Sequence, residues 1–83
     1  MRAADILPDD VNNVTLNGVS VRKGTVGAFL NNARVWADPM TPVNERTTAE
    51  NDIVEAVPAL RALGLFNILE IRNPELRALV DSH

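Results

Sequence analysis

The stretch NVTLNGVSVRK, residues 13–23, decides how the fold begins. Apolar and polar residues alternate on both sides of the dipeptide Asn17-Gly18. Asn-Gly between two alternating runs is the strongest short-range hairpin signal, because both central positions of a type I′ turn need positive φ. The stretch therefore predicts a two-residue antiparallel hairpin with its apolar side chains on one face. The predicted pairs on that face are Leu16 with Val19 and Val14 with Val21.

A helix is predicted directly after the hairpin. Gly24 marks the corner and Thr25 is placed to cap the helix, which ends before Asp38-Pro39. Apolar residues then recur at helical spacing and form a stripe along one side. The stripe consists of Val26, Phe29, Leu30, Ala33 and Trp36.

A second helix is predicted from a capping box, in which Thr47 caps the helix and Glu50 reaches back. Pro58 lies inside this helix and predicts a kink or a break into two short helices, because proline lacks the donor for the preceding turn. Gly64 is predicted to end the helix in the left-handed conformation. The apolar stripe consists of Ala49, Ile53, Ala56, Val57, Leu60 and Leu63.

The segment LFNILEIRN, residues 65–73, has apolar residues on both faces and predicts a buried third strand. Asn73-Pro74-Glu75 then predicts a helix start, with Asn as the cap and Pro at the first helical position. The last helix offers its apolar residues to the core; they are Leu76, Leu79 and Val80.

The predicted order is ββααβα. Because strands and helices do not alternate strictly, we expect an α+β fold with a small three-stranded antiparallel or mixed sheet and helices packed on one face. Residues 1–12 are predicted to be a loosely held arm, since Pro8 and the acidic pair after it end regular structure there. Residues 13–83 are predicted to form a single domain.

The composition excludes several function classes. Eleven acidic against eight basic residues give a net charge of -3, which argues against a general nucleic-acid binder. No apolar run approaches the roughly 20 residues that span a bilayer, and the first ten residues do not resemble a secretory signal. The chain has no cysteine for a disulfide or thiolate metal site. We therefore expect a soluble, cytoplasmic, bacterial-style domain without membrane contact or cofactor.

Catalytic and metal-binding constellations are weak. The one histidine, His83, is the final residue and is expected to fray. The carboxylate pairs Asp9 with Asp10 and Glu50 with Asp52 show no pattern that would bury them, so surface charge explains them. No metal site and no catalytic residue is predicted, and an enzyme ranks third among the function classes.

An anion site is one alternative for the hairpin exit. Two cations precede two glycines at a predicted helix start, where free N–H groups attract anions. However, the pattern matches neither phosphate-loop template, and the glycines are also explained by a turn, a corner and close packing of Gly27 on the sheet. The candidate anion-binding residues are Arg22, Lys23, Gly24, Thr25 and Gly27.

Protein binding is the favoured function. The connector after Trp36 is long for a helix–helix connection and mixes apolar with charged side chains, as interaction surfaces do. The candidate partner-binding residues are Trp36, Met40, Val43 and Arg46. The long apolar stripe of the second helix also suggests a homodimer, since a chain of this size builds a small core. We therefore expect a non-enzymatic domain that binds a protein partner or its own copy; the alternative is a small-ligand or anion-binding domain at Lys23–Gly27.

Overall fold

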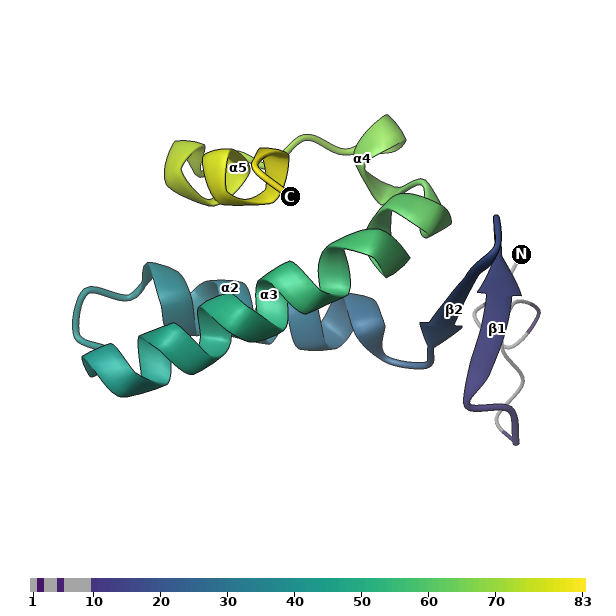
Figure 1. Cartoon of the computed structure of the whole chain (residues 1–83), viewed down its shortest axis with the longest axis horizontal. Coiled ribbons are helices and arrows are strands. Elements are labelled where there is room, and N and C mark those ends of the chain that lie inside the picture. Colours follow the sequence, from purple (N-terminus) through teal and green to yellow (C-terminus); the bar gives the residue numbers. More distant parts are fainter. Residues whose placement is uncertain (1, 3–4, 6–9) are drawn as a thin grey trace.

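The computed structural model describes residues 2, 5 and 10–83. In that part of the chain a two-stranded antiparallel sheet is followed by helices (Figure 1), so the predicted α+β class is confirmed. Most of the predicted arm, residues 1, 3–4 and 6–9, lies outside the described residues. The elements are β1 (Asn13–Leu16), β2 (Val19–Arg22), α2 (Thr25–Ala37), α3 (Val43–Leu63), α4 (Leu65–Ile68) and α5 (Pro74–Asp81).

The hairpin is confirmed together with its register. Asn17 and Gly18 have φ of 49° and 78°, as a type I′ turn requires. The N–H of Lys23 donates to the carbonyl of Asn12 at 2.6 Å, so the ladder continues one pair beyond the two strands. The Cα partners are Asn13 with Arg22, Val14 with Val21, Thr15 with Ser20, and Leu16 with Val19.

Helix α2 begins one residue earlier than predicted, at Thr25, the residue predicted to be its cap. Gly24 occupies the N-cap position with φ of 85°, a left-handed conformation that favours glycine at this corner. Thr25 is already helical, and its hydroxyl donates to the carbonyl of Arg22 at 2.6 Å. Phe29 and Trp36 are buried as predicted, whereas Leu30 is 51% exposed because it lies beside the buried stripe rather than on it.

Helix α3 begins five residues earlier than the sequence predicted. Pro42 precedes its first residue, and the hydroxyl of Thr47 donates to the carbonyl of Val43 at 2.9 Å inside the helix, so the predicted capping box is wrong. The first buried residue of α3 is Ala49, so the exposed turns before it give no apolar period to detect. The helix is continuous through Pro58, so of the two alternatives for this proline, a kink or a break, the break does not occur.

The predicted third strand is wrong. Gly64 ends α3 with φ of 81°, as predicted, and its N–H donates to the carbonyls of Leu60 and Arg61. The chain then forms the short helix α4 in place of a strand. A helical turn lets the neighbours Leu65 and Phe66 both pack against the core, whereas a strand would direct them to opposite faces. The predicted element order ββααβα is therefore wrong, and the observed order is a hairpin followed by helices.

Helix α5 begins as predicted. The side chain of Asn73 accepts hydrogen bonds from the N–H groups of Glu75 and Leu76 at 2.9 and 3.0 Å, and Pro74 occupies the first turn. Leu76 and Val80 are buried and Leu79 is partly buried. The three side chains predicted to face the core therefore do so.

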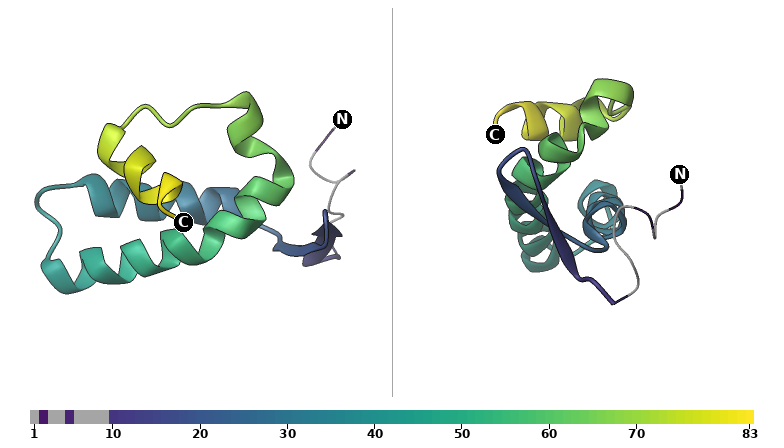
Figure 2. Two further views of the ribbon diagram at one scale, coloured as in Figure 1. Left: turned by 45° about the horizontal axis from the view of Figure 1, so that its top comes forward. Right: turned by 90° about the vertical axis from the view of Figure 1, so that its right-hand side faces the viewer.

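The core forms between helices rather than between helices and a sheet. Helices α2 and α3 lie side by side and antiparallel, and the hairpin sits at one end of this pair (Figures 1 and 2). Val21 of β2 is 2% exposed and β2 contacts α3. The prediction that helices cover one face of a three-stranded sheet is wrong for this reason. The buried core residues are Phe29, Trp36, Ala49, Ile53, Val57, Leu60, Leu76 and Val80.

Candidate functional site

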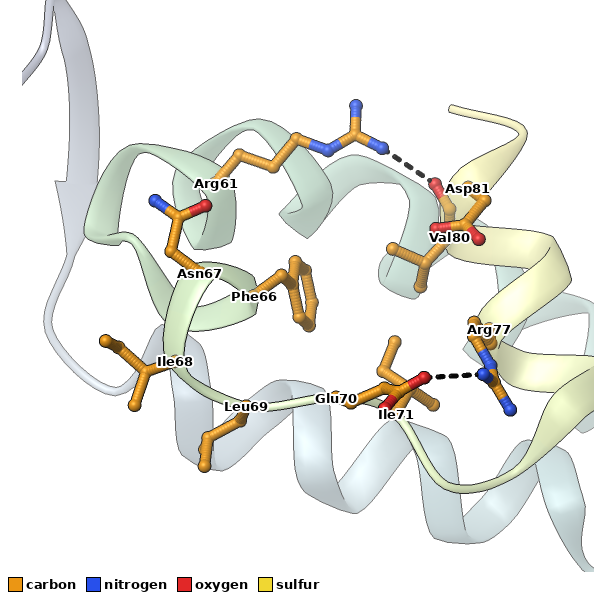
Figure 3. Close-up of a pocket in the computed structure, with 10 residues that line it drawn as sticks. All are labelled: Arg61, Phe66, Asn67, Ile68, Leu69, Glu70, Ile71, Arg77, Val80 and Asp81. Atoms are coloured by element: carbon orange, nitrogen blue, oxygen red, sulfur yellow. Dashed lines mark hydrogen bonds and ion pairs between the residues drawn. The ribbon is translucent and has the colours of Figure 1, made fainter.

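A groove of about 400 Å³ lies between α4, the extended segment after it, and α5 (Figure 3). We call it the C-terminal groove. Its floor is apolar: the side chains of Phe66, Ile71 and Val80 converge there. Phe66 also meets the ring of Phe29 edge to face, with ring centroids 6.2 Å apart. The floor is therefore continuous with the helical core and is held in place by it.

The rim of the C-terminal groove is polar and ordered by two arginines. The guanidinium of Arg61 donates to the carbonyls of Val80 and His83 at 3.0 and 2.8 Å. The guanidinium of Arg77 forms an ion pair with the carboxylate of Glu70 at 2.7 Å. His83, which was predicted to fray, is thus tied to α3 through its carbonyl.

Two large apolar side chains stand exposed beside the C-terminal groove. Ile68 is 85% exposed and Leu69 is 59% exposed. In Figure 3 both side chains point away from the groove floor, on the outer side of the segment. An apolar centre beside a polar rim is the arrangement found in protein interfaces.

The sequence contained a partial signal for this surface. Residues 65–73 carry apolar side chains on both faces, which we interpreted as burial on both faces. The structure only partly buries the side chains of this segment that meet the core, Leu65, Phe66 and Ile71, and leaves Ile68 and Leu69 exposed. Apolar residues that the chain's own core leaves uncovered are candidates for contact with another molecule.

A second groove, of about 690 Å³, contains most of the candidate anion-binding residues. Arg22, Lys23, Gly24 and Thr25 all line it. Gly27 does not line it; Gly27 is exposed, and a Cβ added there would meet nothing within 4 Å. The predicted close packing of Gly27 on the sheet is therefore wrong.

The opposite wall of this second groove carries negative charge. Asp52 and Glu55 of α3 line it together with small residues. Because these carboxylates lie in the same groove as the cations, they would repel an anion bound there. The hydroxyl of Thr25 is already engaged with the carbonyl of Arg22.

The candidate partner-binding residues are divided by the structure. Trp36 is buried; its indole N–H donates to the carboxylate of Glu50 at 3.0 Å, and the guanidinium carbon of Arg46 lies 5.5 Å from the centroid of its ring. Met40 and Val43 are 85% and 81% exposed. The connector is shorter than predicted, since only residues 38–42 lie between α2 and α3.

Of the carboxylates that the sequence places in pairs, the structure describes Asp10, Glu50 and Asp52. Glu50 is engaged by Trp36, Asp52 lines the second groove, and Asp10 is exposed; Asp9 lies outside the described residues. Within residues 2, 5 and 10–83, no three histidine, cysteine, aspartate or glutamate side chains are placed to hold a metal ion. None of the described helices is both long and apolar enough to cross a membrane.

Comparisons with known proteins do not assign a family. No protein-family model matches the chain, and searches of curated proteins and of solved structures gave no significant match.

Proposed function

We propose that this chain is a non-enzymatic protein-interaction domain that binds a protein partner through Ile68, Leu69 and the C-terminal groove. The observation that carries the proposal is the exposure of two adjacent large apolar side chains beside an apolar-floored groove. Removing such side chains from water is favourable by roughly 25 cal/mol for each Å² of apolar surface, and this gain offsets part of the entropic cost of association.

The polar rim supports the same proposal. Arg61 and the Glu70–Arg77 ion pair flank the apolar floor of the groove with polar groups that already make hydrogen bonds. The two hydrogen bonds of Arg61 restrict its side chain before binding, which lowers the entropic cost of association at that position. Energetically important contacts in interfaces cluster at a central apolar site enclosed by such a rim.

The loop surface at Met40 and Val43 is the competing interaction site. It lies at the α2–α3 connection, at the opposite end of the molecule from α4 (Figure 1). Its two apolar side chains, as a pair, are at least as exposed as Ile68 and Leu69, but they are not among the residues that line either groove. The C-terminal groove is therefore the better site for an inserted anchor side chain.

Site-specific photo-crosslinking tests this proposal with a matched control. A photo-reactive phenylalanine analogue replaces Ile68 in one variant and Met40 in the other; both positions are 85% exposed. In an extract of the source cells we expect a discrete adduct from position 68 and none of the same mass from position 40. Excess wild-type protein suppresses this adduct, and excess Ile68→Asp protein does not. Equal adducts from both positions, or equal competition by the two proteins, would refute the proposal.

Anion or small-ligand binding at Lys23–Gly27 is the second candidate function. It is favoured by the convergence of Arg22, Lys23, Gly24 and Thr25 in one groove and weakened by Asp52 and Glu55 opposite them. A phosphate titration followed by amide chemical shifts tests it: saturable shifts at Gly24 to Gly27 that are lost in Lys23→Ala support it. Shifts that do not saturate, or that are unchanged by Lys23→Ala, exclude it.

A further inference from the structure

We propose that two copies of this chain associate by antiparallel pairing of their β1 strands into a continuous four-stranded sheet. This goes beyond the proposed partner site, because it uses the hairpin edge and no residue of the C-terminal groove. It commits to one occupant of that edge, a second copy of this chain.

The hairpin register determines which backbone groups face outward. In a two-residue hairpin the residues flanking the turn exchange hydrogen bonds, and hydrogen-bonded pairs then alternate with non-hydrogen-bonded pairs. The bond from Lys23 N–H to the Asn12 carbonyl confirms this alternation. The N–H and C=O groups of Asn13 and Thr15 therefore point away from β2. Within the described residues, no backbone hydrogen bond outside the hairpin ladder reaches them.

On the other edge of the hairpin, one outward backbone group is already engaged by the chain itself. Ser20 and Arg22 carry the outward groups of β2, and the carbonyl of Arg22 accepts the hydroxyl of Thr25 at 2.6 Å. In the equivalent pairing of β2, with the axis through Val21, Arg22 would face Ser20 of the second copy and the two Arg22 side chains would be diagonal neighbours on one face, where like charges repel. Strand β1, with the sequence NVTL, carries no charge. The two edges therefore differ, and β1 is the one suited to pair with a copy of itself.

Symmetry then fixes the register. A two-fold axis through Val14 places Val14 opposite Val14 of the second copy, as a non-hydrogen-bonded pair. Asn13 then faces Thr15 of the second copy, and both outward groups of each residue find partners. If the axis is perpendicular to the sheet, the apolar faces of both hairpins lie on the same side. Val14, Leu16 and Val19 are only partly buried in the single chain, so this face gains contacts.

The expected strength follows from the size of the contact. A four-residue strand pair buries less than the roughly 1,200 Å² of a stable standard interface. The association is therefore expected to be reversible and to depend on protein concentration. It has to be measured at equilibrium over a range of concentrations. Open strand edges of this kind are a recognised route to such pairing.

Paired proline substitutions test the edge in the full chain. Thr15→Pro and Ser20→Pro each remove one outward N–H from opposite edges of the same hairpin, where proline is tolerated. By sedimentation equilibrium we expect Thr15→Pro to weaken dimerisation about tenfold or more, since each dimer loses two hydrogen bonds. Ser20→Pro is expected to leave the dimerisation constant within about twofold. Equal effects of the two variants would overturn the proposal.

A disulfide trap remains informative if a proline variant fails to fold. The chain has no cysteine, so Val14→Cys introduces a single thiol, and the non-hydrogen-bonded position places the two Cα atoms about 4.5 Å apart, within disulfide range. We expect mild oxidation to give covalent dimer faster for Val14→Cys than for Ser20→Cys. The control is stringent because Ser20 is exposed and Val14 is partly buried. Faster cross-linking of Ser20→Cys would refute the register.

Hydrogen exchange gives a third readout and separates this proposal from the partner site. The amides of Asn13 and Thr15 are expected to become protected as protein concentration rises, in wild type and in Ile68→Asp alike. A monomer at millimolar concentration with both amides unprotected would overturn the strand pairing and leave the proposed function standing. Loss of the position-68 adduct while the strand pairing persists would refute the proposed partner site and leave the strand pairing standing.

Discussion

The indole N–H of Trp36 donates a hydrogen bond to the carboxylate of Glu50 at 3.0 Å. This contact joins α2 to α3 at the rim of the core, where Trp36 is 8% exposed. The guanidinium carbon of Arg46 lies over the ring of the same indole, 5.5 Å from its centroid. Glu50, which the sequence placed in a predicted helix cap, is therefore the hydrogen-bond acceptor for the indole of Trp36.

Glu50→Ala is expected to destabilise the protein by about 1–3 kcal/mol, because the buried indole N–H loses its partner. Glu50→Gln retains an acceptor oxygen and is expected to cost less. Chemical denaturation followed by the fluorescence of the single tryptophan measures both values. Equal losses for the two variants would show that the hydrogen bond contributes nothing.

Two glycine substitutions are expected to have opposite signs. Gly64 has φ of 81°, so Gly64→Ala is expected to lower the free energy of unfolding by about 1–2 kcal/mol. The added Cβ would lie 3.7 Å from Nδ2 of Asn67, an ordinary contact, so the cost is conformational. Gly27 is helical, exposed and unobstructed, and Gly27→Ala is expected to raise stability by up to about 1 kcal/mol. Thermal unfolding of both variants checks the two signs.

Residues of the two predicted apolar stripes are expected to contribute unequally to the free energy of unfolding. Ile53 is fully buried at 0% exposure, and Ile53→Ala is expected to cost about 2–5 kcal/mol through lost contacts and a cavity. Leu30 belongs to the predicted stripe but is half exposed, so Leu30→Ala is expected to stay within about 1 kcal/mol. Urea denaturation midpoints compare them. A large loss for Leu30→Ala would mean that a partner or second copy covers it.

The cap of α5 is expected to support the C-terminal groove. Asn73→Ala removes an acceptor for two N–H groups and is expected to cost about 1 kcal/mol. Asn73→Asp keeps the acceptor and is the matched control. Amide exchange in α5 is expected to accelerate in Asn73→Ala alone. Unchanged exchange would show that packing of Leu76 and Val80 holds the helix without its cap.

Local signals predicted local structure well. The hairpin at Asn17-Gly18, the left-handed stop at Gly64 and the cap at Asn73 depend on the conformational preferences of single residues, and all three predictions are confirmed. The start of α3 was missed, because Pro42 is not a side-chain cap and the first turns are exposed. Local chemistry cannot indicate where an exposed helix begins without such a signal.

The segment after Gly64 could not be predicted from its pattern. An apolar run of this length is compatible with a strand or a helical turn, and the choice depends on which side chains the core accepts. Leu65 and Phe66 together find space against the core only in a helical turn. The exposure of Ile68 and Leu69 is a consequence of that choice. A prediction that assigned the whole segment to a buried strand could not indicate this exposure.

The side-chain amide of Asn17, at the tip of the hairpin, donates to the carbonyl of Ala62 at 3.0 Å, across 45 positions of sequence. The α2–α3 pair is instead closed by the short connection at residues 38–42. Because closing a long loop costs more entropy than closing a short one, the helix pair is expected to form before the hairpin docks. Asn17 therefore serves two purposes: it forms the turn, and it fastens the hairpin to the end of α3 once the helix pair is expected to have formed.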